Sequence, residues 1–219
     1  MLASGKGNVM PNDLLRTHVT NPIEREYEGW VMDQIEDYFL SVRRLAITFA
    51  VSPTEEHHWP ADEVVFSSGK IVGLQFKVPH LSPRRPQAYE LSELNWHLSK
   101  PAGQLGLVLN HPEIFYCLPT FLNRRYHGAA LHHCLFWRPV TTSDQPAWYD
   151  NPHSKSAHKK VADSSRWGRL VEDILECPVG LPLSGNSGPN SFSGYIEKIQ
   201  RQLVELKQKS HIAFVFIPR

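Results

Sequence analysis

The chain has 219 residues, of which 41% are apolar and 21% charged, and this composition excludes an intrinsically disordered protein. The 23 Lys and Arg residues nearly balance the 22 Asp and Glu residues, which excludes a wholly basic, histone-like nucleic-acid binder but not a local basic surface. No stretch approaches the ~18 consecutive apolar residues of a membrane span, and the N-terminal residues lack the apolar core of a secretory signal. The 3 cysteines form no CxxC pair, which favours a reducing compartment. We therefore expect a cytoplasmic protein with no membrane partner.

The first predicted element is a helix, which follows residues 1–20, a lead-in that we expect to be flexible. Asn21, Pro22 and Glu24 suit the N-cap, first and third positions of a helix. Apolar side chains then recur at helical spacing as far as Val42. These residues predict a helix from Asn21 to Val42.

A strand and a β-hairpin are predicted next. Residues 45–51 are rich in β-branched and aromatic side chains, which favours a strand. Residues 62–66 and 71–78 have the character of the two strands of a hairpin, with SSGK between them as the turn. Because side chains alternate along a strand, Gln75 and Lys77 are predicted to share one face, while the residues that alternate with them face the core.

The remaining predicted elements alternate between helices and strands. They are helices at 88–98 and 195–209, a helical run at 105–109, and strands at 115–121, 130–137 and 212–217. Residues 140–190, rich in Pro, Ser, Gly and Asn, are predicted to form an insertion that holds one short amphipathic helix at 167–175. The order of elements predicts a single α/β domain over 21–219, with a mixed central sheet in which the last strand is buried.

Asp62, Gln75 and Lys77 carry the chemical groups that metal-dependent hydrolysis of a phosphodiester requires. The predicted hairpin would place Asp62 beside the other two residues. Mg²⁺ prefers carboxylate and carbonyl oxygens and keeps several waters, so Asp62 and the amide oxygen of Gln75 are candidate ligands. Lys77 is a candidate to orient the attacking water and to stabilise charge on the phosphate.

The first helix offers a further candidate ligand. At about 100° per residue, Glu24 and Glu28 fall within or at the edge of the apolar stripe of this helix. An inward-facing carboxylate is costly unless it has a purpose. Glu24 also suits a capping role at the helix start, which favours Glu28, and both residues stay candidates.

The region 21–139 resembles a known nuclease superfamily. Its order α-β-β-β-α-β, with an Asp, a short hairpin and a Gln-x-Lys triplet, resembles the PD-(D/E)XK superfamily in its Q-x-K variant. The segment PTEEHHWPADEVVF followed by LQFKVP resembles in particular the nuclease cores of bacterial anti-phage and restriction-type effectors.

The resemblance implies a restriction-endonuclease-like core and a set of site residues. Asp62 would be the central metal ligand, Gln75 would replace the usual acidic ligand, and Lys77 would be the catalytic lysine. Glu24 or Glu28 would be the glutamate of the first helix. The implied cofactor is Mg²⁺ or Mn²⁺, the implied substrate is nucleic acid with double-stranded DNA favoured, and the implied role is antiviral defence or restriction. Because many such nucleases need two active sites to cut both strands, a homodimer or a regulatory partner protein is expected.

Basic residues outside the motif are candidates for contacts with phosphate. They are Arg84, Arg85, Arg124, Arg125, Lys159 and Lys160. The last two belong to a stretch in which basic and aromatic side chains interleave, as they do in proteins that follow a nucleic-acid backbone. A solvated loop explains the same stretch equally well.

Two alternative functions also fit the sequence. The domain could be a catalytically inactive nuclease fold that binds nucleic acid or a protein partner. Gln75 favours this alternative, because it gives the site one negative charge fewer than a carboxylate would. Alternatively, His132 and Cys134 could share one face of a strand and bind zinc together with Cys117 on the neighbouring strand, in an interaction protein.

Overall fold

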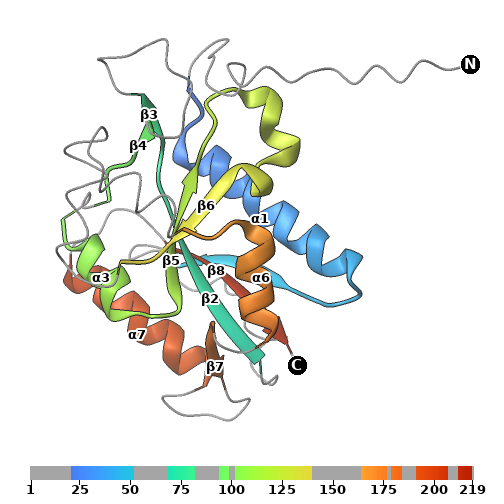
Figure 1. Cartoon of the computed structure of the whole chain (residues 1–219). Coiled ribbons are helices and arrows are strands. Elements are labelled where there is room, and N and C mark those ends of the chain that lie inside the picture. Colours follow the sequence, from blue (N-terminus) through green and yellow to red (C-terminus); the bar gives the residue numbers. More distant parts are fainter. Residues whose placement is uncertain are drawn as a thin grey trace, which may run out of the picture.

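The computed structural model describes residues 21–51, 69–81, 94–98, 102–139, 164–176, 179–183, 191–206 and 212–218. These residues form an α/β fold around a mixed sheet of six strands, which confirms the predicted fold class at this level (Figure 1). The helices are α1 (Glu24–Ser41), α3 (Gln104–Asn110), α6 (Trp167–Leu175) and α7 (Phe192–Glu205), with the 3₁₀ helices η3 (Arg124–Ala129) and η4 (Leu131–His133). The strands are β1 (Ile47–Val51), β2 (Gly69–Phe76), β3 (His80–Leu81), β4 (Leu94–Asn95), β5 (Ile114–Pro119), β6 (Cys134–Trp137), β7 (Leu181–Leu183) and β8 (Ile212–Pro218).

The strands of the sheet lie in the order β1-β8-β2-β5-β6, and β7 pairs with β2 beside β5. β2 and β5 are parallel, whereas the other pairs of this sheet are antiparallel. β8 comes from the end of the chain and lies between β1 and β2, and all of it but the last residue is buried, as predicted. None of the helices within the described residues has the length and apolar character needed to cross a bilayer.

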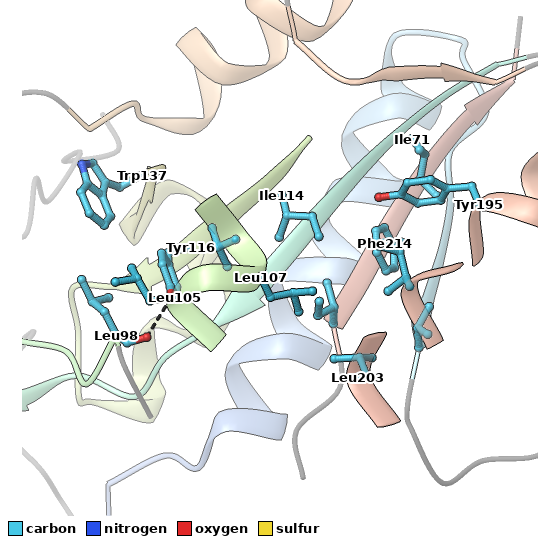
Figure 2. Close-up of a cluster of buried hydrophobic side chains, with 14 of the residues drawn as sticks. Ile71, Leu98, Leu105, Leu107, Ile114, Tyr116, Trp137, Tyr195, Leu203 and Phe214 are labelled. Atoms are coloured by element: carbon cyan, nitrogen blue, oxygen red, sulfur yellow. Dashed lines mark hydrogen bonds between the residues drawn. The ribbon is translucent and has the colours of Figure 1, made fainter. Parts of the chain in front are cut away.

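Helices cover both faces of the sheet (Figure 1). On one face, Ile35 of α1 and Trp167 of α6 belong to the same hydrophobic cluster as Val72, Leu74 and Phe76 of β2. On the other face, α3 and α7 pack on a second cluster. Figure 2 shows part of this second cluster, including Ile71, Leu107, Ile114, Tyr195, Leu203 and Phe214.

β2 is hydrogen-bonded along both of its edges. β8 pairs with residues 69–74 on one edge, while β7 pairs with 69–71 and β5 with 73–76 on the other. The predicted hairpin partner, residues 62–66, lies outside the described residues. The positions of β2 that this hairpin would use are taken by other strands, so the predicted pairing is wrong.

Gly69 and Lys70, which were expected in the hairpin turn, are the first residues of β2. A Cβ atom at Gly69 would lie 2.5 Å from the carbonyl oxygen of Ile217 in β8. Glycine is therefore needed here for close approach of two strands and not for a turn.

The helix predicted at 88–98 is wrong in its described part. Leu94 lies in β4, which pairs with β3, and Leu94, Trp96 and Leu98 are all buried. This spacing of two is typical of an extended chain, whereas the prediction had followed the wider spacing of the leucines. The indole N–H of Trp96 donates to the carbonyl oxygen of Pro119 at 3.1 Å and fixes this extended segment against β5.

The other predicted elements are confirmed, with changes at their ends. α6 has the predicted bounds, and α1, α3, α7, β1, β5 and β8 overlap their predicted ranges. β6 is shorter than predicted, because Leu131–His133 form η4.

The start of α1 differs from the prediction, because its N-cap is Ile23. The carboxylate of Glu26 occupies the third helical position and accepts the Ile23 backbone N–H at 2.9 Å. Glu24 is consequently the first residue of the helix. The capping role that was considered for Glu24 belongs to Glu26.

Glu36 of α1 connects this helix with β1. Its Oε1 accepts hydrogen bonds from the backbone N–H of Thr48 at 2.8 Å and from the Thr48 hydroxyl at 2.6 Å. In the part of the chain that the structure describes, β1 pairs with β8 and with no other strand. Glu36 therefore satisfies a donor on the outer edge of the sheet.

A buried polar network joins α7 to the start of β5. Tyr195 donates to Oε1 of Glu113 at 2.5 Å, and Nδ1 of His111 lies 2.9 Å from the same oxygen. Nε2 of His111 lies 2.6 Å from Oε1 of Gln202. Burial alone would raise the pKa of Glu113, but the hydrogen bonds from His111 and Tyr195 lower that pKa below its ordinary value. The network therefore holds a carboxylate inside the protein.

We expect Tyr195→Phe to destabilise the fold more than Tyr116→Phe does. The Tyr195 hydroxyl donates to a buried carboxylate, whereas the Tyr116 hydroxyl donates to the neutral carbonyl of Leu98 at 2.8 Å (Figure 2). Loss of a charged hydrogen bond costs about 1.5–3 kcal/mol and loss of a neutral one about 0.5–1.5 kcal/mol. Urea unfolding of both variants measures these losses of free energy, and equal losses would contradict a charged Glu113.

Candidate functional site

The C-terminal end of β2 brings polar side chains next to the parallel strand β5. Gln75 lies opposite Tyr116, and the backbone N–H of Lys77 donates to the carbonyl oxygen of Cys117 at 3.2 Å. Ligands of α/β proteins commonly bind at the carboxyl ends of parallel strands. This end of β2 is therefore the candidate site.

Lys77 is buried, with 5% of its surface exposed. Its Nζ donates to Oε1 of Gln104, the first residue of α3, and lies 5.9 Å from the centroid of the Tyr116 ring. Burial lowers the pKa of Lys77 to about 8, and the carboxylate of Glu24 opposes this shift. Near neutral pH the amine can therefore both carry and release a proton.

Gln75 presents a buried amide oxygen beside Lys77. The residue is 1% exposed, and its Nε2 donates to the carbonyl oxygen of Phe76 at 3.3 Å. Its Oε1 is buried and accepts no hydrogen bond. A buried acceptor without a partner costs free energy, and a cation would satisfy it.

Glu24 is the glutamate of α1 that the structure associates with Lys77. It lies at the helix start, is half-buried, and its charge acts on the Lys77 amine. Glu28 is also half-buried and lies one turn further along α1. Because Glu26 takes the capping role, the reason for preferring Glu28 over Glu24 is removed.

Several predicted site residues lie outside the described residues. These are Asp62, the proposed central metal ligand, and the candidate phosphate contacts Arg84, Arg85, Lys159 and Lys160. Of the predicted set, the structure describes Gln75 and Lys77 two residues apart at the end of β2, and the charge of Glu24 acts on the Lys77 amine.

Arg124, predicted as a phosphate contact, forms a bidentate ion pair with Glu26. Its Nε lies 2.7 Å from Oε1 and its Nη2 lies 2.7 Å from Oε2 of that carboxylate. The hydrogen bond from Arg124 is the main cause that lowers the pKa of Glu26 to about 2. Arg125 is exposed, and its backbone N–H donates to Oδ1 of Asn123 at 3.0 Å. The charge of Arg124 is therefore already balanced by Glu26.

The zinc hypothesis loses its geometric premise. His132 lies in η4 and not on a strand, so it does not share a strand face with Cys134. Cys117 is fully buried, and burial raises the pKa of its thiol well above the ordinary value, which opposes the thiolate form that zinc binds. Within the described ranges, no group of three or more His, Cys, Asp and Glu residues could hold a metal ion.

The residues at the end of β2 fit a hard divalent cation in their chemistry. Gln75 offers an amide oxygen that accepts no hydrogen bond from the described residues, and Glu24 offers a carboxylate whose charge acts on the Lys77 amine. Mg²⁺ and Mn²⁺ take such oxygen ligands and retain waters.

Gln104 belongs to the site and was missed by the sequence analysis. It is 1% exposed and accepts from Lys77, yet it is 27 residues away along the chain. Gly103 precedes it as the N-cap of α3 and has a φ of 86°, in the left-handed region. This glycine was the available signal for a helix start at Gln104, but nothing in the sequence indicates which residue the glutamine contacts.

The sequence matches no protein-family model and no curated protein, and the structure matches no solved structure.

We expect the stability of the protein to rise between about pH 8 and pH 10.5 relative to Lys77→Met. The unfolded chain holds a proton on this lysine up to its ordinary pKa of 10.5, whereas the folded protein releases it near pH 8. Stability rises with pH wherever the unfolded state binds more protons, and each pKa unit corresponds to about 1.4 kcal/mol. We expect a relative gain of about 2–3 kcal/mol.

Urea unfolding of both proteins at pH 7.5, 9 and 10.5 measures this gain. Other lysines and tyrosines titrate equally in the two proteins and cancel in the difference. A constant difference across this range would show that Lys77 keeps an ordinary pKa.

Proposed function

We propose that the protein is a metal-dependent nuclease that cleaves phosphodiester bonds of nucleic acid, with double-stranded DNA as the favoured substrate. The observation that carries the proposal is a buried lysine two residues after a buried glutamine, at the carboxyl end of β2 beside the parallel strand β5. The amide oxygen of this glutamine has no hydrogen-bond partner among the described residues. Burial of the Lys77 amine and the Gln75 amide costs free energy. A site that binds a cation and a phosphate would explain why these polar groups are buried there.

Each residue has a role in this proposal. Gln75, Glu24 and Asp62 would hold Mg²⁺ or Mn²⁺, with Glu28 as the other candidate on α1. The metal ion, when bound, polarises the phosphate and lowers the pKa of water. Lys77 orients the attacking water and, because its pKa is about 8, can take a proton from it near neutral pH. Gln104 holds the Lys77 amine in place through the hydrogen bond that it accepts.

The order of the described elements supports a restriction-endonuclease-like core within the α/β fold. α1 and β1 precede β2, and α3 leads from β2 to the parallel strand β5. The resemblance of the motif further suggests a cytoplasmic role in antiviral defence or restriction. Cleavage of both strands by such a protein calls for a homodimer or a regulatory partner.

A catalytically inactive nuclease fold is the second candidate. The interaction that favours it is the hydrogen bond from Lys77 to Gln104, since a lysine engaged in this way fills a structural role without any substrate. Such a protein would bind nucleic acid or a protein partner without cleaving.

Plasmid nicking tests the two candidates. With Mg²⁺ or Mn²⁺, the wild-type protein should nick supercoiled DNA, and Lys77→Met should lower the rate at least about 100-fold, within the range of a general acid–base contribution. Glu24→Gln and Glu28→Gln, the same change one turn apart on α1, show which glutamate holds the ion, because only loss of the ligand should lower the rate strongly. No nicking by the wild type with any divalent cation, or equal nicking by wild type and Lys77→Met, would favour the inactive fold.

Gln75→Glu should strengthen binding of Mn²⁺. A carboxylate at this position adds one negative charge next to the proposed ion, and divalent cations prefer such ligands. Titration calorimetry with Mn²⁺ on the wild type, Gln75→Glu and Gln75→Leu gives the dissociation constants. The expected order of affinity is Glu, then Gln, then Leu, and an affinity that is the same in all three would remove Gln75 from the metal site.

A further inference from the structure

Three basic side chains gather where η4 meets the start of α6, and we call them the η4–α6 surface: His132, His133 and Arg166. Nη1 of Arg166 lies 3.4 Å from the carbonyl oxygen of His132, to which it donates. Arg166 and His132 are exposed, and His133 is half-buried. η4 and α6 are separated in sequence but are brought together by β6, where Phe136 pairs with Ser165.

The η4–α6 surface has no acidic partner within the described part of the chain. Among the described residues, none of the ion pairs involves Arg166, His132 or His133. Burial lowers the pKa of His133, and the charges of Arg166 and His132 lower it further. The three groups therefore repel one another when protonated, and an anion would relieve this repulsion.

Two other arginines near this surface are paired with carboxylates. Arg169, three residues after Arg166 on α6, lies 3.1 Å from Asp173 and 3.7 Å from Glu172. Arg124 of the neighbouring η3 is paired with Glu26 of α1. Arg166, in contrast, forms no ion pair with a carboxylate among the described residues.

Aromatic rings border the same surface. The rings of Tyr126 and His133 are 5.5 Å apart, and those of Phe121 and His133 are 6.1 Å apart. Phe121 is buried, whereas Tyr126 is half-buried, so part of the Tyr126 ring remains accessible. Basic groups with accessible aromatic rings suit a nucleic acid better than a purely acidic peptide.

The surface lies at the same end of the sheet as Lys77. η3 and η4 follow the C-terminal end of β5, and β5 runs parallel to β2, whose C-terminal end carries Lys77. α1 contacts both η3 and η4 and begins with Glu24, and Figure 1 shows these elements beside one another at that end. A duplex that reaches the candidate site can therefore extend over the η4–α6 surface.

We propose that the η4–α6 surface binds the phosphate backbone of the nucleic-acid substrate, with Arg166 as its main contact. This inference rests on the proposed nuclease function for the identity of the substrate. In this proposal Arg166 replaces Arg124, whose charge is balanced by Glu26, as the main phosphate contact of this part of the protein.

Binding of a labelled duplex of about 20 base pairs, followed by fluorescence anisotropy in EDTA, tests the surface without cleavage. Arg166→Gln should weaken binding about 3–10-fold and lower the slope of log K against log salt concentration by about one, as expected for one lost phosphate contact. Arg169→Gln removes the same charge from the same helix but from a paired side chain, and should change affinity less than about twofold.

Three outcomes would overturn the proposal: wild-type affinity in Arg166→Gln, equal weakening by Arg166→Gln and Arg169→Gln, or displacement of the duplex by polyglutamate of equal charge as readily as by unlabelled DNA. Nicking assays separate this failure from failure of the nuclease function. Activity that depends on Lys77 but not on Arg166 would refute only the proposed role of the η4–α6 surface. Binding that depends on Arg166 without any cleavage would refute only the proposed catalytic role.

Discussion

The fold depends on the complete enclosure of β2. This strand is hydrogen-bonded along both edges, by β8 on one side and by β7 and β5 on the other, and helices cover both of its faces. Such a strand is normally apolar throughout, because any polar side chain on it must find a partner inside the protein. Gln75 and Lys77 break this pattern at the end of the strand. Their burial is the feature on which the functional interpretation rests.

The two polar residues meet this requirement differently. Lys77 has Gln104 as a hydrogen-bond partner and Glu24 as a countercharge, and its lowered pKa lets it be neutral at little cost. Gln75 satisfies only its amide N–H₂ group, through Phe76. In the proposed function, Lys77 exchanges a proton and Gln75 binds a cation. The η4–α6 surface adds positive charge at the same end of the sheet, so the parts that a phosphodiester would need come from β2, α1, α3 and the segment after β5.

Local patterns predicted the elements well, whereas contacts between distant segments were not predictable. The bounds of α6 follow from apolar spacing within one helix, and the buried β8 follows from an unbroken apolar run. The hairpin failed because the neighbour of β2 comes from the far end of the chain, which no turn signal reveals. In the site, the alternation of β2 placed Gln75 and Lys77 together, but Gln104 and the pairing of Arg124 with Glu26, 98 residues apart, depend on the tertiary fold.

The contact between Glu36 and Thr48 has a consequence for how the protein behaves among its own copies. A strand at the border of a sheet offers unpaired backbone groups to any extended chain that approaches, and this leads to aggregation. In β1, the N–H of Thr48 is already taken by a carboxylate from α1. An incoming strand would have to displace that carboxylate and tolerate its negative charge, so α1 protects the border of the sheet from growth by strand addition.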